Sequence, residues 1–163
     1  MNFKEKVEFG MNGRNAYGDI LAELGDLNKD IVVLSADAMS STRGNIFGNK
    51  YPERTFNFGI AEANMVSAAA GMSLAGKIPV VGAYGFLLSM RACEMVRTDL
   101  CYTNSNVKLV ATATGLAMGP AGSTHHCLED IGIMRSFPNI TIVSPASALE
   151  TAKATYEIIN NHE

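Results

Sequence analysis

The sequence predicts an α/β fold with a doubly wound, mostly parallel sheet and helices on both of its faces. Short apolar runs alternate along the chain with longer segments whose apolar residues have helical spacing. Runs that are apolar at consecutive positions are typical of strands buried on both faces, as in parallel sheets. Because crossovers between parallel strands are right-handed, helices should cover both faces and ligands should bind at the carboxyl ends of the strands.

Five short runs are the candidate strands. In chain order they are 31–36 (IVVLSA), the mixed run 55–58 (TFNF), 78–83 (IPVVGA), 107–112 (VKLVAT) and 140–143 (ITIV). The segments between and after them have helix-compatible apolar spacing and few helix breakers. These segments are 15–27, 61–75, 88–102, 128–136 and 148–160. No repeat or linker divides the chain, so residues 1–163 are expected to form one domain.

Composition excludes several classes of function. The chain has 163 residues, 47% of them hydrophobic, and a net charge of −3. It has no basic cluster for a nucleic-acid surface, and no apolar run near the roughly 20 residues that span a bilayer. The start lacks the apolar stretch of a signal peptide, so a cytoplasmic location is expected. The odd, scattered set of Cys93, Cys101 and Cys127 favours buried free thiols over a zinc site or disulfides.

Residues that follow the candidate strands should gather at one edge of the sheet. They are Asp37, 59–62, 84–87, 113–126 and Ser144. Glu62 is unusual among them because it is an acid at the start of an otherwise small and apolar helix. The field of the helix N-terminus favours a carboxylate there, while apolar neighbours such as Ile60 and Met65 exclude water from it. From the residues alone, Glu62 either favours the first helical turn by its charge or has a functional role.

An ordered set of motifs resembles the pyrimidine-binding domain of the transketolase family. The segment FNFGIAEANM (56–65) is followed by AAGMSLAG (69–76) and IPV (78–80). SADAMSST (35–42), NVKLVAT (106–112), STHHCLEDIGIMRSFPNITIVSPA (123–146) and the early Arg14 fall in the family's order and spacing. The resemblance covers residues 13–153, which is nearly the whole chain.

The resemblance implies a transferase that uses thiamine diphosphate to move a two-carbon ketol unit from a ketose to an aldose. Glu62 matches the glutamate that hydrogen-bonds N1′ of the cofactor's aminopyrimidine and so activates the cofactor. His125 matches the histidine near the reacting carbons and contacts substrate as well. The remaining implied positions are Asp37, Tyr84, Phe86 and Leu87 for cofactor binding, and Arg14 and Ser41 for substrate phosphate.

The chain departs from the family pattern at three places. Ala113 stands where the family usually has a histidine, and Ala121 stands where it has an acid, so ordinary pentose-phosphate substrates are not implied. Of the family aromatics that pack on the aminopyrimidine, one matches Tyr84 and another falls on Leu87 by ungapped counting. Phe86 substitutes for the second by a local shift.

No segment resembles the GDG…N motif that holds the diphosphate through Mg²⁺. The resemblance therefore implies that the diphosphate-binding and C-terminal domains are absent from this chain and that a partner domain or subunit holds Mg²⁺. It also implies that the chain assembles as a dimer or with a diphosphate-binding subunit. Both a fragment and one subunit of a split enzyme remain open. Rival interpretations are a deoxyxylulose-phosphate-synthase-like component, a 2-oxoacid dehydrogenase β-type component and a non-catalytic cofactor-binding or assembly module.

Overall fold

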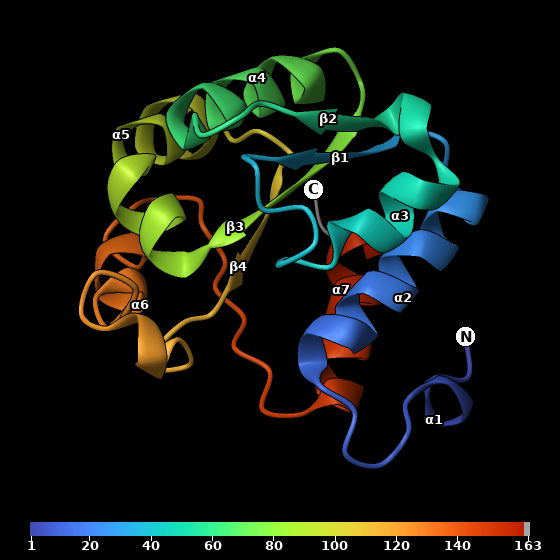
Figure 1. Ribbon diagram of the computed structural model, residues 1–163. Helices are drawn as coiled ribbons and strands as arrows, with labels where there is room; N and C mark the ends of the chain where they lie inside the picture. The colour runs from blue at the N-terminus through green and yellow to red at the C-terminus, as the bar shows by residue number, and fades with distance from the viewer. Residues whose placement is uncertain (162–163) are drawn as a thin grey trace.

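The computed structural model describes residues 1–161 and contains a four-stranded parallel sheet (Figure 1). Its strands are β1 (Ile31–Ser35), β2 (Thr55–Asn57), β3 (Ile78–Tyr84) and β4 (Lys108–Thr112). The spatial order is β2-β1-β3-β4, and every neighbouring pair is parallel. The chain thus steps from β1 to one side and then crosses to the other, which makes the sheet doubly wound. The predicted fold class is confirmed.

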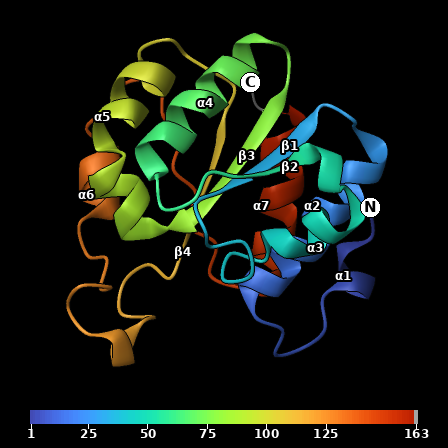
Figure 2. The ribbon, with the colours of Figure 1, turned by 45° about the horizontal axis from the view of Figure 1, so that its top comes forward.

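One face of the sheet is covered by three helices that form a shared core. These are α2 (Gly13–Leu27), α3 (Gly44–Lys50) and α7 (Ala148–Asn161), with the short α1 (Phe3–Lys6) beside α7. Apolar side chains of α2 are buried against Val33 and Val80 of the sheet and against Phe47 of α3. Figure 2 shows these helices together on one side of the strands. The amino-terminal and carboxyl-terminal helices therefore hold each other against the same face.

The opposite face is covered by α4 (Glu62–Leu74) and by a long helical segment after β3 (Figure 2). That segment is divided into η2 (Leu87–Arg91) and η3 (Val96–Cys101), both with π-helical geometry, and α5 (Cys93–Met95) between them. The sequence predicts one helix over 88–102, and the helical segment is confirmed. Its π geometry was not predicted. Wide π turns inside helices occur frequently at functional sites.

Short elements complete the architecture. The 3-10 helices η1 (Pro52–Arg54) and η4 (Gly119–Ala121) lie in loops, and α6 (Asp130–Met134) occupies the middle of the predicted helix 128–136. Neither α1 nor α3 was predicted from the sequence. Residues 44–50 (GNIFGNK) contain two glycines and two asparagines, which weaken the local helix signal.

The predicted strand 140–143 is wrong. This segment has no regular secondary structure and makes no ladder with β4, and Ile142 and Val143 are 40% and 50% exposed. Asn139 directly precedes it in the left-handed region, with φ of 59°, and the Asn139 side-chain amide donates to the carbonyl of Cys101 at 3.1 Å. Residues 140–143 are not part of the four-stranded sheet, and Ser144 therefore does not follow a strand.

The predictions drawn from composition, on the cysteines and on membrane spans, can be compared with the structure of residues 1–161. Cys101 and Cys127 are buried and Cys93 is partly exposed, and all three are free thiols. No three His, Cys, Asp or Glu side chains in this part of the chain are grouped to hold a metal ion. None of the helices described is long and apolar enough to cross a membrane.

Candidate functional site

The carboxyl ends of the four parallel strands bring the predicted site segments to one edge of the sheet. Asn57, the last residue of β2, joins two of these segments. Its Oδ1 accepts hydrogen bonds from the backbone N–H of Asp37 at 2.9 Å and from that of Gly59 at 3.1 Å. Asp37 is exposed and has a φ of 53°, a region that few residues other than glycine adopt. Asn57 therefore fixes both the loop after β1 and the turn that leads to Glu62.

Glu62 is the first residue of α4 and is 1% exposed. No side chain caps this helix, because the N-cap residue is Ala61. Nη1 of Arg91 lies 3.1 Å from Oε2 of Glu62, and the Arg91 side chain is 53% exposed. A carboxylate buried to this degree requires a charged or hydrogen-bonding partner. The guanidinium of Arg91 supplies that partner from η2.

Aromatic rings lie at the end of β3. The rings of Tyr84 and Phe86 stack with centroids 6.0 Å apart and an interplanar angle of 9°. The imidazole of His125 meets both rings edge-on, at 5.3 Å from Phe86 and 6.4 Å from Tyr84. Thr124 Oγ1 lies 3.0 Å from Nδ1 of His125. Leu87 is partly exposed and begins η2.

His125 belongs to a long loop after β4 that extends from the body of the molecule (Figure 2). Two backbone hydrogen bonds between Gly115 and Cys127, of 2.8 and 2.9 Å, close the base of this loop. Ala113 lies at its start with a φ of 54°, and Ala121 is exposed near its tip. Ala113 and Ala121, two of the three positions that depart from the family pattern, are therefore both in the loop that carries the imidazole.

The loop is anchored by inward-facing side chains. Burial raises the pKa of the Cys127 thiol, and the carboxylate of Asp130 raises it further. Cys127 is therefore a packing residue rather than a reactive thiol. Nε2 of His126 is buried and has no hydrogen-bond partner among residues 1–161. The two neighbouring histidines thus have different environments, and His125 is the one beside the aromatic rings.

Arg14 and Ser41 are adjacent although 27 positions separate them. Nη1 of Arg14 donates to the carbonyl oxygen of Ser41 at 3.0 Å. Next to this contact, Nε of Arg43 donates to Oδ1 of Asn15 at 2.8 Å. Two guanidinium groups therefore lie at the loop that follows β1. An arginine has five N–H donors, so one backbone contact leaves Arg14 donors for an anionic oxygen.

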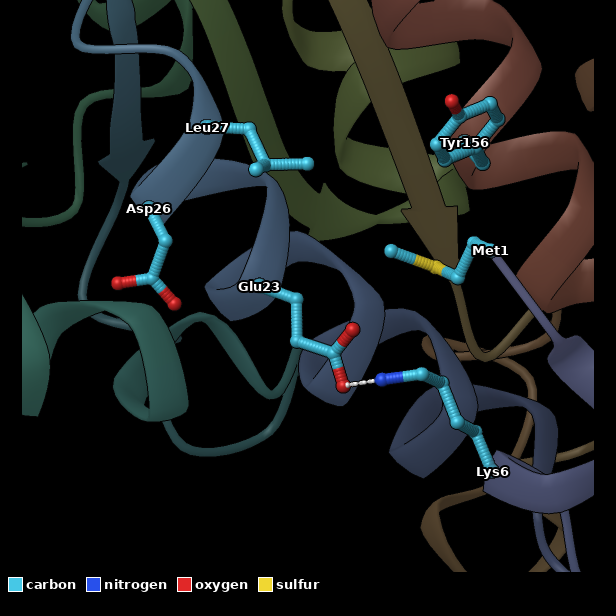
Figure 3. Close-up of a pocket in the computed structure, with 6 residues that line it drawn as sticks. All are labelled: Met1, Lys6, Glu23, Asp26, Leu27 and Tyr156. Carbon is cyan, nitrogen blue, oxygen red and sulfur yellow. Dashed lines mark hydrogen bonds and ion pairs between the residues drawn. The ribbon is translucent and has the colours of Figure 1, made fainter.

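A separate surface pocket lies away from these residues (Figure 3). Its lining includes Lys6 and Glu23, which form an ion pair, and Asp26 and Leu27 at the end of α2. Because α2 ends just before β1 begins, this pocket lies toward the amino ends of the strands. Ligands of doubly wound sheets bind at the opposite end. The pocket therefore does not compete with the Glu62 edge as the candidate site.

Sequence reasoning missed two residues of this edge. Arg91 is one of several arginines in the sequence, and no local pattern predicts that it reaches Glu62. Asn57 precedes a Phe-Gly turn, and an Asn beside a turn is a signal for side-chain to backbone bonding that could have identified it. Both residues act through contacts between segments that are distant along the chain.

This edge combines a buried carboxylate, two stacked rings and an imidazole on a parallel sheet. Together they define an α/β domain suited to an aromatic cofactor at the carboxyl ends of its strands. Residues 10–163 match the family described as the transketolase pyrimidine-binding domain. The chain belongs to this family.

Known relatives agree in sequence and in fold. One subunit of an apulose-4-phosphate transketolase from Actinobacillus succinogenes is 44% identical over 132 residues, which are 80% of this chain and 42% of that protein. A solved split-gene transketolase, in an inactive β4 tetramer, is 41% identical with a TM-score of 0.81 over 92% of this chain and 48% of that one. The transketolase of Leishmania mexicana has the same fold at 24% identity, with a TM-score of 0.82 over 98% of this chain and 25% of that one. The chain spans less than half the length of the curated relatives it matches.

Proposed function

We propose that this chain forms the pyrimidine side of a thiamine diphosphate site in a transketolase-like enzyme. The complete enzyme would transfer a two-carbon ketol unit between a ketose and an aldose. The burial of Glu62, at 1% exposure, carries the proposal. A carboxyl group shielded from water is suited to share a proton with a weakly basic ring nitrogen, which is the role proposed for Glu62 toward N1′ of the aminopyrimidine.

The aromatic residues at the same edge of the sheet support a planar cofactor ring as the ligand. Tyr84 and Phe86 offer aromatic surface, and Leu87 adds an aliphatic one, against which an aminopyrimidine would pack. Asp37 would line the same site from the loop after β1. When bound, thiamine diphosphate supplies carbanion chemistry, and the protein supplies orientation and proton handling. His125, beside the rings, would donate or accept a proton at the substrate oxygens.

The substrate class is a phosphorylated sugar. Arg14 and Ser41, joined by a 3.0 Å hydrogen bond, would bind its phosphate. Ala113 and Ala121 offer no side-chain polar group to the sugar, so selection of a particular hydroxyl configuration would come from other residues. A relative named for apulose 4-phosphate, itself a sugar phosphate, agrees with this class.

A complete site needs a partner. We infer that a diphosphate-binding chain or domain holds Mg²⁺ and the diphosphate, and that further copies of this chain take part in the assembly, as a dimer or a larger oligomer. The relatives named as subunits of transketolases, and the β4 tetramer of a solved split-gene transketolase, support this inference. The cytoplasm is the proposed location.

The test is reconstitution with the diphosphate-binding partner, Mg²⁺ and thiamine diphosphate, followed by ketol transfer from a ketose phosphate to several aldoses. Glu62→Ala should lower turnover at least about a hundredfold, the usual contribution of a proton-transfer group. Glu157→Ala, which removes an exposed carboxylate of α7, is the matched control. Unchanged turnover in Glu62→Ala would refute the role of Glu62. Cofactor binding without transfer to any aldose would instead favour a non-catalytic binding module.

A further inference from the structure

Arg91 is the one cation within ion-pair distance of Glu62 among the residues that the structure describes. The two partners have very different environments, because the carboxylate is 1% exposed while the arginine side chain is 53% exposed. Arg91 therefore extends from the solvent-exposed surface to a buried carboxylate. An exposed arginine could remain solvated without a partner at little cost in free energy. The contact therefore stabilises the buried carboxylate of Glu62 more than it stabilises Arg91.

The position of Arg91 is linked through the backbone to the aromatic rings. Phe86 directly precedes η2, and Arg91 is the last residue of that five-residue π-helix. The N–H of Ala92 donates to the carbonyl of Leu87 at 3.0 Å, which closes the wide turn. An extra residue in a helical turn changes the direction of every side chain that follows it. The π turn therefore sets the direction of Arg91 relative to the rings that stack at its start.

The surrounding side chains leave Arg91 as the main source of charge compensation. The helix N-terminus also stabilises Glu62, but that effect is typically well below the cost of burying an isolated carboxylate. The N-cap residue, Ala61, contributes no side-chain hydrogen bond. Without Arg91, Glu62 would gain stability by turning toward water, and it would then lose its fixed direction.

We propose that Arg91 is a positioning residue that holds one oxygen of the Glu62 carboxylate, so that the other oxygen keeps a fixed direction toward the aminopyrimidine. This inference rests on the proposed function for its cofactor, but the contact itself belongs to this chain alone. Arg91 does not touch the reacting atoms. Its effect on the cofactor is transmitted through Glu62.

The first experiment uses the chain by itself and needs no cofactor. Chemical unfolding is measured for the wild type, Arg91→Met, Glu62→Gln and the double variant. Arg91→Met should lower the folding equilibrium constant about tenfold or more in the wild-type background, because it leaves a buried charge without its partner. In the Glu62→Gln background the same change should cost less than about threefold. Equal losses in both backgrounds would overturn the inference.

The second experiment uses the reconstituted assembly and measures the Kd of thiamine diphosphate, the kcat and the KM of the sugar. Arg91→Met should raise the Kd of the cofactor about tenfold and lower kcat, with the sugar KM unchanged, and Arg91→Lys should restore part of both. Arg97→Met, which removes an exposed arginine from η3, is the control. If Arg91→Met binds and turns over like the wild type while Glu62→Ala is inactive, the Arg91 inference fails and the proposed function stands. Wild-type turnover in Glu62→Ala would defeat the proposed function itself.

Discussion

Gly85→Ala tests how tightly the loop that carries His125 packs on the end of β3. Gly85 is buried between Tyr84 and Phe86. A Cβ added there would lie 2.7 Å from Cγ2 of Thr114 and 3.1 Å from Sγ of Cys127. Carbon atoms prefer about 3.5–4.0 Å, so the nearer contact is short by about 1 Å. Either the loop or the strand end must therefore move.

The expected cost follows from two opposing effects. Overpacking a tight site costs about 1–3 kcal/mol, while alanine restricts the unfolded chain and returns about 0.4–1 kcal/mol. We expect a net loss of about 1–2 kcal/mol in the free energy of unfolding, measured by urea denaturation. Thr114→Ser removes the clashing Cγ2, so the double variant with Gly85→Ala should recover most of the loss.

A control variant separates packing from a general effect of alanine. Gly71 lies within α4, and a Cβ there would meet nothing within 4 Å. Gly71→Ala should therefore stabilise the chain by up to about 1 kcal/mol through helix propensity. The reasoning about the loop is refuted if Gly85→Ala is as stable as the wild type, or if Thr114→Ser fails to rescue it.

Three further predictions concern separate features. Asn57→Ala removes the acceptor for the N–H groups of Asp37 and Gly59. It should lower the free energy of unfolding in urea by about 1–3 kcal/mol and raise the cofactor Kd. A free energy of unfolding within about 0.5 kcal/mol of the wild type, which is typical of surface substitutions, would contradict the role of Asn57. Burial raises the pKa of Tyr17 above its ordinary 10.0, so the folded state keeps its proton when the unfolded state loses it. Stability contributed by Tyr17 is therefore present below about pH 10 and is lost above it, at up to about 1.4 kcal/mol per pH unit, and Tyr17→Phe should flatten this alkaline decline; equal slopes for both proteins would argue against it. Arg14→Met should raise the KM of a phosphorylated ketose at least about tenfold while leaving that of its unphosphorylated counterpart unchanged, and equal effects on both would exclude a phosphate contact.

The sheet could be predicted from the sequence because its strands are apolar at consecutive positions. Residues 31–35 (IVVLS) are all buried, which is the pattern that a parallel strand between two helical layers requires. The segment 140–143 has a similar composition but stays outside the sheet. The residue before it, Asn139, is in the left-handed region and bonds to the carbonyl of Cys101, 38 positions earlier, and no short window contains such a contact.

Candidate site residues could be predicted where the local sequence identifies them. They could not be predicted where their role depends on a contact between segments that are distant along the chain. Glu62 is recognisable because an acid opens an apolar helix after a strand. The proximity of His125 to Phe86 is as expected for segments that follow strands of one sheet, whereas only the family resemblance linked Arg14 with Ser41. The Arg91 contact depends on a π turn, which has no sequence signal as clear as a cap or a breaker.

The rate at which the C2 proton of the bound thiazolium exchanges with deuterium measures cofactor activation without any sugar substrate. The reconstituted assembly would be compared as wild type and Glu62→Gln, both saturated with thiamine diphosphate and Mg²⁺. Loss of the carboxylate should slow the exchange at least about a hundredfold. An exchange rate equal to that of the wild type would contradict the role of Glu62 as the activating carboxylate.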